Sequence, residues 1–329
     1  MSGTATSPVG RLTVDLAVHA GVVLTRIRHK PGLAIASRLV GRPRAQAVAI
    51  VPAVLNLCAT AHRQAAAAAV GLETGDGNRS RHETIRDHGL TILRDWPACL
   101  GVPAEPGALG ELTVLGAGPG PADDQDGAMT ALRRRLCGER ADPTRFEMPD
   151  LRRWLSAGET PTARFLAAVR HRFDPVWGRV ALPAPTLADI TDAALPAREA
   201  TCTDRVRGMP LLAEIETAEG RSLFARLLGR LLDLLRELDG RNGTTIRPPT
   251  GFGIAEASRG RLVHTARLDG DTITAYRIVT PTDWNLTDDG LLYRMLTSLP
   301  PDERLESAAR LALACVDPCV PTTLRVCHA

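Results

Sequence analysis

Arg259 is the side chain that points most directly to a binding site. Residues 262–268 and 272–279 alternate apolar and polar side chains around an Asp-Gly-Asp turn, which predicts an antiparallel hairpin. Such a hairpin brings its flanks, 256–260 and 280–282, to the same end. A guanidinium beside backbone N–H groups and a threonine hydroxyl suits small anionic acceptors. An ordinary hairpin with a satisfied arginine also fits these residues.

Cysteines and histidines supply a second set of candidate ligands. Cys58 and His62 are four residues apart, so on a helix they share one face. This pair fits either a metal site or a buried free cysteine beside a histidine. A zinc site near the C-terminus is a further alternative, although its spacing only half fits the zinc patterns. Its ligands would be Cys315, Cys319, Cys327 and His328.

The hairpin region resembles the large subunit of nickel–iron hydrogenases. That family carries Glu-Ala-Pro-Arg-Gly, then a histidine, then Pro-Ser/Thr-x-Trp-Asn, and its arginine and Pro-Ser/Thr pair surround the cyanide ligands of the active-site iron. Here Ser258 replaces the proline, and the matching residues are Arg259, Gly260, His264, Pro281, Thr282, Trp284 and Asn285. The resemblance implies a cyanide and carbonyl pocket formed by Ala257, Arg259, Leu262, Thr280, Pro281 and Thr282. It also implies supporting roles for His62, Glu256, His264 and Asp317.

The metal cysteines match that family only in part. Its first signature is Arg-x-Cys-Gly-x-Cys-x-x-x-His, in which Cys58 and His62 match while the first cysteine falls on Leu55. Its C-terminal signature is Asp-Pro-Cys-x-x-Cys-x-x-His, in which Cys319 matches while the second cysteine falls on Thr322. The glutamate of the family's proton path has no equivalent near residues 31–34, and we expect no tail for a maturation protease to remove.

These departures resemble the HupK/HoxV group, degenerate relatives of the hydrogenase large subunit that act in maturation. The resemblance implies a non-catalytic scaffold or chaperone that holds an Fe(CN)2(CO) fragment transiently through Cys58 and Cys319, without nickel. Cys327 is a candidate substitute ligand. The implied partners are a HypC-type chaperone, a HypD-type protein and the hydrogenase large subunit. The alternatives are a divergent catalytic large subunit and a metal-free chaperone that mimics the large subunit.

Composition limits the other classes of function. Of the 329 residues, 44% are hydrophobic and 23% are charged, so a packed core is well supplied. The net charge of only +3, with Lys30 as the single lysine, gives nucleic-acid binding no support. No apolar run reaches the length of a membrane span, and the N-terminus lacks the regions of a signal peptide. We therefore expect a cytoplasmic protein whose seven cysteines form no disulfide framework.

Several shorter motifs are misleading. The spacing of His82 and His88 does not fit the zinc protease pattern His-Glu-x-x-His. Residues 111–121 suggest a strand followed by Gly-x-Gly, but Pro121 and the acidic residues after it fit no dinucleotide site. We predict a flexible surface loop near 116–127 instead.

The elements predicted from periodicity are a hairpin over 11–28, one or two buried helices over 45–70, and an amphipathic core-facing helix over 221–238. Together they predict an α+β fold with a mostly helical core and peripheral antiparallel β-hairpins. We expect residues 1–329 to form a single domain that resembles the hydrogenase large subunit.

Overall fold

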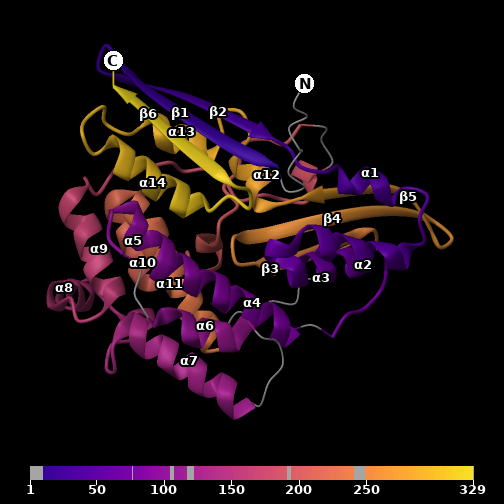
Figure 1. Ribbon diagram of the computed structural model, residues 1–329, viewed down its shortest axis with the longest axis horizontal. Helices are drawn as coiled ribbons and strands as arrows, with labels where there is room; N and C mark the ends of the chain where they lie inside the picture. Colours follow the sequence, from indigo (N-terminus) through magenta and orange to yellow (C-terminus); the bar gives the residue numbers. More distant parts are fainter. Residues whose placement is uncertain are drawn as a thin grey trace.

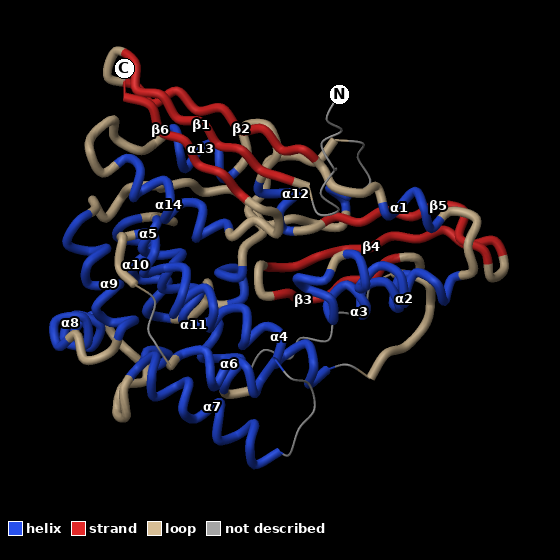
Figure 2. Tube along the Cα trace, viewed as in Figure 1, coloured by secondary structure: helices blue, strands red, loops and turns tan. Residues whose placement is uncertain are grey.

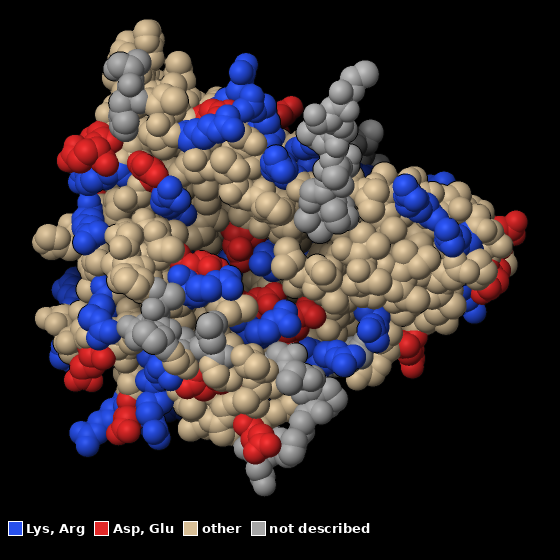
Figure 3. All heavy atoms as spheres, viewed as in Figure 1, with Lys and Arg blue, Asp and Glu red and all other residues tan. Residues whose placement is uncertain are grey.

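The computed structural model describes residues 10–75, 77–103, 107–116, 122–190, 194–240 and 249–328. Two small β-sheets lie along one side of the molecule, and helices fill the other side (Figure 1, Figure 2). The predicted α+β fold with a mostly helical core is therefore confirmed. On the face shown in Figure 3, acidic and basic side chains are intermingled, as the small net charge leads one to expect.

The first sheet joins the two ends of the chain. Strands β1 (Arg11–His19) and β2 (Val22–Lys30) form the predicted N-terminal hairpin. Alternate residues of β1, namely Leu12, Val14 and Leu16, are buried against the helices. The third strand, β6 (Thr322–His328), pairs in parallel with β1. The sequence did not predict β6, because a parallel partner at the far end of the chain leaves no local turn signal.

The second sheet contains the hairpin that was predicted from the sequence. Its strands β3 (Phe252–Ala257), β4 (Gly260–Asp269) and β5 (Thr272–Val279) are antiparallel in that order. Gly270, in the turn between β4 and β5, has a φ of +57°, which a glycine adopts at little cost. The structure adds β3, so the Glu256 region is a strand rather than a loop.

Helices α1 (Ile35–Leu39), α2 (Arg44–Val54) and α3 (Ala59–Ala69) lie against this second sheet. The approach is close because both surfaces carry small residues. A side chain at Gly253 would come within 1.8 Å of the Ala65 carbonyl oxygen, so only glycine fits there. The prediction of one or two helices over 45–70 is confirmed, and the structure has two.

The α2–α3 connection bends the chain sharply. A short 3₁₀ turn, Asn56–Cys58, separates the two helices, whose axes differ by 98°. Across the described residues, no single helix is long and apolar enough to cross a membrane, and only this bent pair passes the same test of length and composition.

Most of the remaining helices form the large core, whereas Trp284 of α12 packs in a separate cluster. Their bounds are α4 (Gly77–Leu90), α5 (Trp96–Cys99), α6 (Ala108–Gly116), α7 (Ala122–Cys137), α8 (Met148–Ala157), α9 (Pro161–Arg172), α10 (Pro210–Glu219), α11 (Leu223–Leu238), α12 (Pro281–Asn285), α13 (Leu291–Thr297) and α14 (Leu305–Val316). A π-helical turn, Thr91–Asp95, joins α4 to α5.

Helix α11 differs from its prediction in one respect. We expected one apolar face, but nearly every residue is buried, including Arg226, Arg230 and Asp233. The polar face is buried because each of these charges has a partner of opposite sign inside the protein. Arg226, for example, donates two hydrogen bonds to the Glu199 carboxylate. The helical period of the apolar residues is confirmed. Periodicity does not show whether the polar face lies in solvent or forms ion pairs inside the protein.

The predicted strand and flexible loop over 111–127 are wrong where the structure describes them. Residues up to Gly116 belong to α6, and Ala122–Gly127 begins α7. Residues 117–121 lie outside the described part of the chain. Asp124 and Asp126 stand in the first turns of α7, where negative charge is favourable next to the free backbone N–H groups.

Candidate functional site

Four separate segments meet around one small cavity of about 70 Å³, which we call the thiol pocket. They are the α2–α3 bend, the β3–β4 turn, the start of α12 and the segment after α14. The lining residues are Leu55, Asn56, Leu57, Cys58, His62, Ala257, Arg259, Leu262, Thr280, Pro281, Thr282, Cys319 and Val320. The segments are far apart in sequence, so only the tertiary fold creates the cavity.

Cys58 enters the pocket from the bend. It is the last residue of the 3₁₀ turn and is only 7% exposed. Its Sγ lies 3.4 Å from Arg259 Nη1 and 3.9 Å from Ser258 Oγ. Burial raises the pKa of the Cys58 thiol to about 12, and the Arg259 charge only partly offsets this. Without a metal, Cys58 is therefore a neutral thiol near pH 7.

Arg259 is fixed between two carboxylates. Its Nη1 lies 3.5 Å from Asp87 Oδ2, and its Nε lies 3.4 Å from Asp317 Oδ2. Asp317 is in turn 3.0 Å from Arg230 Nη1. Burial opposes the charge of Arg259, but Asp317, Cys58 and Asp87 more than compensate, and its pKa is raised. The guanidinium therefore stays charged and stationary at the pocket wall.

Cys319 faces the pocket from the other side and is held by Thr282. The Thr282 hydroxyl donates to Cys319 Sγ at 3.0 Å and accepts from the Cys319 backbone N–H at 3.0 Å. Burial raises the pKa of the Cys319 thiol, and the Thr282 hydrogen bond opposes that increase. Thr282 is positioned by α12, which begins with a capping box between Thr280 and Asp283.

Three hydrogen-bonded side chains, His62, His264 and Tyr276, extend from the pocket into the second sheet. His62 Nδ1 lies 3.0 Å from His264 Nε2, and His264 Nδ1 lies 2.8 Å from the Tyr276 hydroxyl. Burial lowers the pKa of His62 to about 4 and places that of His264 well below its usual value. Both rings are therefore neutral at pH 7, and they hold α3 against β4 and β5.

Of the residues expected to surround the cyanide ligands, all six line the thiol pocket, together with Cys58, Cys319 and His62. Asp317 and His264 lie one layer behind, bonded to Arg259 and His62. Glu256 does not support this pocket. It alternates with Ala257 along β3 and faces the opposite side of the sheet, where it pairs with Arg205 and Arg261.

The structure contradicts the suggestion that Cys327 returns as a substitute ligand. Cys327 lies on β6 beside Ala17 and is exposed. An extended strand rises about 3.3 Å per residue, so the course of β6 carries Cys327 away from Cys319.

The zinc alternative fails as well. Cys315 is buried with its Sγ 3.6 Å from the Leu223 carbonyl oxygen, while Cys319 bonds Thr282 and Cys327 is exposed. The three thiols therefore occupy different surroundings, which is incompatible with one tetrahedral site.

Sequence reasoning missed Asp87, Ser258 and Arg230. Asp87 accepts a hydrogen bond from Ser258 at 3.2 Å and pairs with Arg259. No local signal separates an aspartate on a solvated helix face from one that points into a pocket. The sequence shows that Ser258 replaces the family's proline, but it does not show that the Ser258 hydroxyl bonds Asp87.

A second cluster contains the residue types of a metal site. The ligand atoms of His88, Cys202 and Asp233 lie within 4.8 Å of one another and are fully buried. However, His88 Nε2 bonds Asp233 at 2.8 Å, and Arg205 donates two further bonds to Asp233, at 2.9 and 2.5 Å. Arg230 adds a second guanidinium beside His88. The charges of Arg205 and Arg230 repel a metal ion, and the hydrogen bonds already occupy the His88 and Asp233 atoms that would bind it.

Comparison with solved structures identifies the fold. The fold is that of the nickel–iron hydrogenase large subunit. A [NiFeSe] hydrogenase of Dm. baculatum covers 92% of this chain and 94% of its own, with a TM-score of 0.59 and 14% identity. The NAD+-reducing [NiFe]-hydrogenase gives a TM-score of 0.50 at 16% identity, covering 91% and 93%. At these identities the similarity establishes the fold alone.

Sequence comparison identifies the family. The hydrogenase expression/formation protein HupK of Rhodobacter capsulatus is 33% identical over 89% of this chain and 90% of its own length, so the chain belongs to the HupK family. HupK of Azotobacter vinelandii is 27% identical over 97% and 99%, and HoxV of Cupriavidus necator is 26% identical over 89% and 92%. No family model matches the chain. The names of these relatives are consistent with a role in hydrogenase maturation.

Proposed function

We propose that this protein is a non-catalytic maturation scaffold that holds an Fe(CN)2(CO) fragment through Cys58 and Cys319 and relays it to a hydrogenase large subunit. The observation that carries the proposal is the thiol pocket, in which two cysteine sulfurs share one small cavity with Arg259 and Thr282. The names of the relatives, hydrogenase expression/formation proteins, support the maturation role.

The donor set of the pocket suits such a cargo. Soft thiolate ligands favour iron of this kind, and cyanide nitrogens accept hydrogen bonds from nearby donors. Arg259 and Thr282 are such donors, while Ala257, Leu262 and Pro281 supply apolar surface for a carbonyl ligand. A water molecule needs about 10–15 Å³ of such a cavity. A cavity of about 70 Å³ therefore has room for several diatomic ligands.

Loading the fragment requires two deprotonations. Both thiols have raised pKa values, so each is protonated before iron arrives. Each Fe–S bond that forms replaces an S–H bond and releases one proton. The Arg259 guanidinium beside Cys58 stabilises the thiolate once it has formed. Because each thiol must lose its proton, we expect loading to strengthen as the pH rises.

Nickel chemistry is not expected at this pocket. Leu55 lines the cavity at the position that matches the family's first cysteine, so an apolar side chain stands where a thiolate ligand would be needed. Thr322, which matches the last one, is exposed at the start of β6. Two thiols in place of four favour a scaffold over a divergent catalytic subunit.

The decisive experiment is infrared spectroscopy on protein purified without oxygen from a host that expresses the maturation genes. Iron and nickel are assayed in the same samples. We expect cyanide and carbonyl stretching bands with iron and without nickel. Cys58→Ser and Cys319→Ser should each abolish the bands, whereas Cys327→Ser, which changes an exposed thiol on β6, should retain them.

The other outcomes separate the alternatives. Nickel together with hydrogen turnover would make the protein a divergent hydrogenase. Absence of metal and bands from a wild-type sample that still supports maturation would leave a metal-free chaperone that mimics the large subunit. In that case, Cys58→Ser would leave maturation intact.

The proposed partners are a HypC-type chaperone, a HypD-type protein and the hydrogenase large subunit. A relay needs a donor of the fragment and an acceptor, so at least one early and one late partner must bind this chain. Anaerobic gel filtration of purified pairs tests this directly. Failure of all three proteins to form a complex with the iron-loaded chain would contradict the relay.

A further inference from the structure

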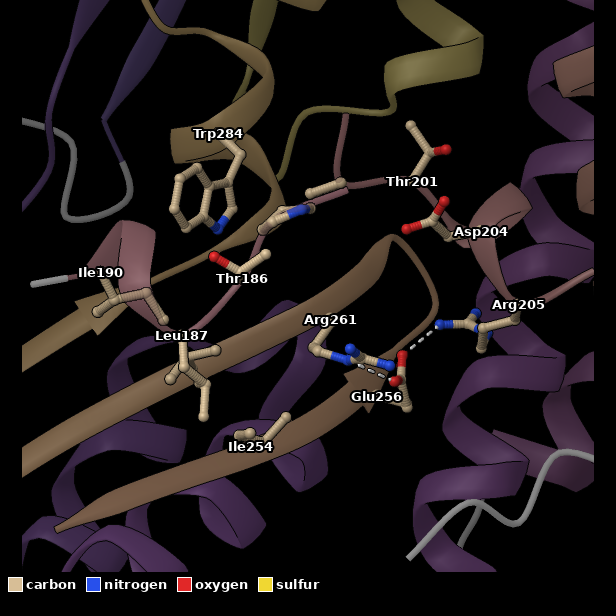
Figure 4. Close-up of a pocket in the computed structure, with 13 residues that line it drawn as sticks. Thr186, Leu187, Ile190, Thr201, Asp204, Arg205, Ile254, Glu256, Arg261 and Trp284 are labelled. Carbon is tan, nitrogen blue, oxygen red and sulfur yellow. Dashed lines mark hydrogen bonds and ion pairs between the residues drawn. The ribbon is translucent and has the colours of Figure 1, made fainter. Parts of the chain in front are cut away.

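A second cavity lies on the opposite face of the β3–β4–β5 sheet, and we call it the outer pocket. Its volume is about 210 Å³. Alternate residues of the strands divide the two cavities: Ala257 and Leu262 face the thiol pocket, whereas Ile254, Glu256 and Val263 face the outer one. The remaining walls come from the segment 185–190, from residues 200–205 and from Trp284 (Figure 4).

The two ends of the outer pocket differ in character. Trp284, Leu187, Ile190 and Ile254 form an apolar end, and Asp204, Arg205, Glu256 and Arg261 form a charged end (Figure 4). A ligand that fills the pocket must therefore have an apolar body and a polar head. The cavity is smaller than the roughly 300–1,000 Å³ of pockets for drug-sized ligands, which indicates a small molecule or one terminal residue of a peptide.

Most polar groups of this pocket are already saturated by the protein. Arg205 donates to both oxygens of Asp233, to Glu256 and to the Ala257 carbonyl. Asp204 pairs with Arg207, and the hydroxyl groups of Thr186 and Thr201 donate to Asp189 and Glu199. These groups need nothing from a ligand.

Two donors are left over. The indole of Trp284 is only 1% exposed, and its N–H, which points toward Thr186 in Figure 4, has no acceptor among the described residues. Arg261 is half-exposed and bonds Glu256 through Nε alone, at 2.8 Å, so its terminal nitrogens have no partner in the described part of the chain. Both donors border the cavity without a described protein acceptor, so an acceptor oxygen of a ligand would replace water there and form direct hydrogen bonds.

We propose that the outer pocket binds a small organic carboxylate with an apolar body and a second acceptor oxygen. The carboxylate pairs with the terminal nitrogens of Arg261, the body packs on Ile254, Val263 and Leu187, and the second oxygen accepts from the Trp284 N–H. A free oxo acid has this chemistry, and so does the C-terminal residue of a peptide, whose amide carbonyl supplies the second oxygen. The site is independent of the iron cargo proposed for the thiol pocket.

The Trp284 N–H itself reports on binding. The chain has four tryptophans, so protein labelled with ¹⁵N-tryptophan gives four indole signals by NMR. Trp284→Phe assigns its signal, or replacement of the other three in turn does so if that variant fails to fold. The probes are 5-oxohexanoate for the free acid and N-acetyl-leucine for the peptide terminus, with N-acetyl-leucinamide as the uncharged control.

We expect both acids to shift the Trp284 signal. The acid that binds with the lower Kd shows whether the natural ligand is a free oxo acid or a peptide C-terminus. Loss of a charge-assisted hydrogen bond in Arg261→Gln should raise Kd at least tenfold. Arg267→Gln, at an exposed position on the same strand outside the pocket, should leave Kd unchanged. An unmoved Trp284 signal with both acids would overturn the proposal. So would equal binding of the amide, or an unchanged Kd in Arg261→Gln.

Discussion

Two clusters in this protein combine the same residue types with opposite consequences. The thiol pocket brings Cys58 and Cys319 to Arg259 with Asp87 and Asp317 behind it. The buried cluster brings Cys202 to His88 and Asp233, with Arg205 and Arg230 beside them. The first surrounds a cavity, whereas the second is fully packed.

The difference lies in what remains available to a ligand. In the buried cluster, the carboxylate of Asp233 is fully occupied by His88 and Arg205, and both arginines repel a cation. In the thiol pocket, the carboxylates are occupied by the arginines, which leaves the sulfurs facing the cavity. Residue types alone favour the buried cluster as a metal site. The hydrogen bonds favour the thiol pocket instead, because only its sulfurs are available to a ligand.

The largest effect should come from Asp233→Ala. The change leaves Arg205 buried without its main partner, and loss of one member of a buried pair costs about 3–5 kcal/mol. Urea unfolding should show this loss. Glu306→Ala, which breaks the exposed pair with Arg310 in α14, is the control and should cost no more than about 1 kcal/mol. A similar midpoint for both variants would contradict a structural role for the buried cluster.

The next effect is a pH dependence carried by His62. Its pKa in the folded protein is about 4, below the 6.5 of a free histidine, so the unfolded chain binds more protons between these values. Stability should therefore fall as pH decreases from 6.5 to 4, by about 3 kcal/mol from this group alone. The test compares unfolding free energies of wild type and His62→Gln across this range. Parallel curves would rule out the neutral buried histidine.

A smaller effect is expected from Thr282→Val. The variant removes the hydroxyl that bonds both Cys319 Sγ and the Cys319 N–H, which should cost about 1–2 kcal/mol. It should also raise the pKa of the Cys319 thiol further, because Thr282 opposes the effect of burial. Titration of alkylation rate at Cys319 measures this change, and Thr282→Ser should behave as wild type.

The smallest effect should be that of Cys202→Ala on metal content. If the buried cluster holds no metal, the iron content of the anaerobically purified variant should equal that of wild type. Loss of iron in this variant, with the fold intact by circular dichroism, would move the metal site from the thiol pocket to the buried cluster.

Local patterns predicted a large part of the fold. The hairpins around residues 20 and 270, the helix pair before Val70 and the helix before Leu238 follow from alternation, turn residues and period. Strand β6, strand β3 and helix α7 were missed. β6 depends on a partner at the other end of the chain, and the acidic start of α7 has the composition of a loop.

The sequence by itself determined the family and the residues that surround the thiol pocket, because short motifs keep their spacing when a fold is inherited. Only the tertiary structure decided which side of β3 each residue faces, which placed Glu256 in the outer pocket and Ala257 in the thiol pocket. It also decided that Asp87 reaches Arg259 and that Cys327 does not reach Cys319. These contacts join segments far apart in the chain, and burial and pairing across such distances leave no local pattern.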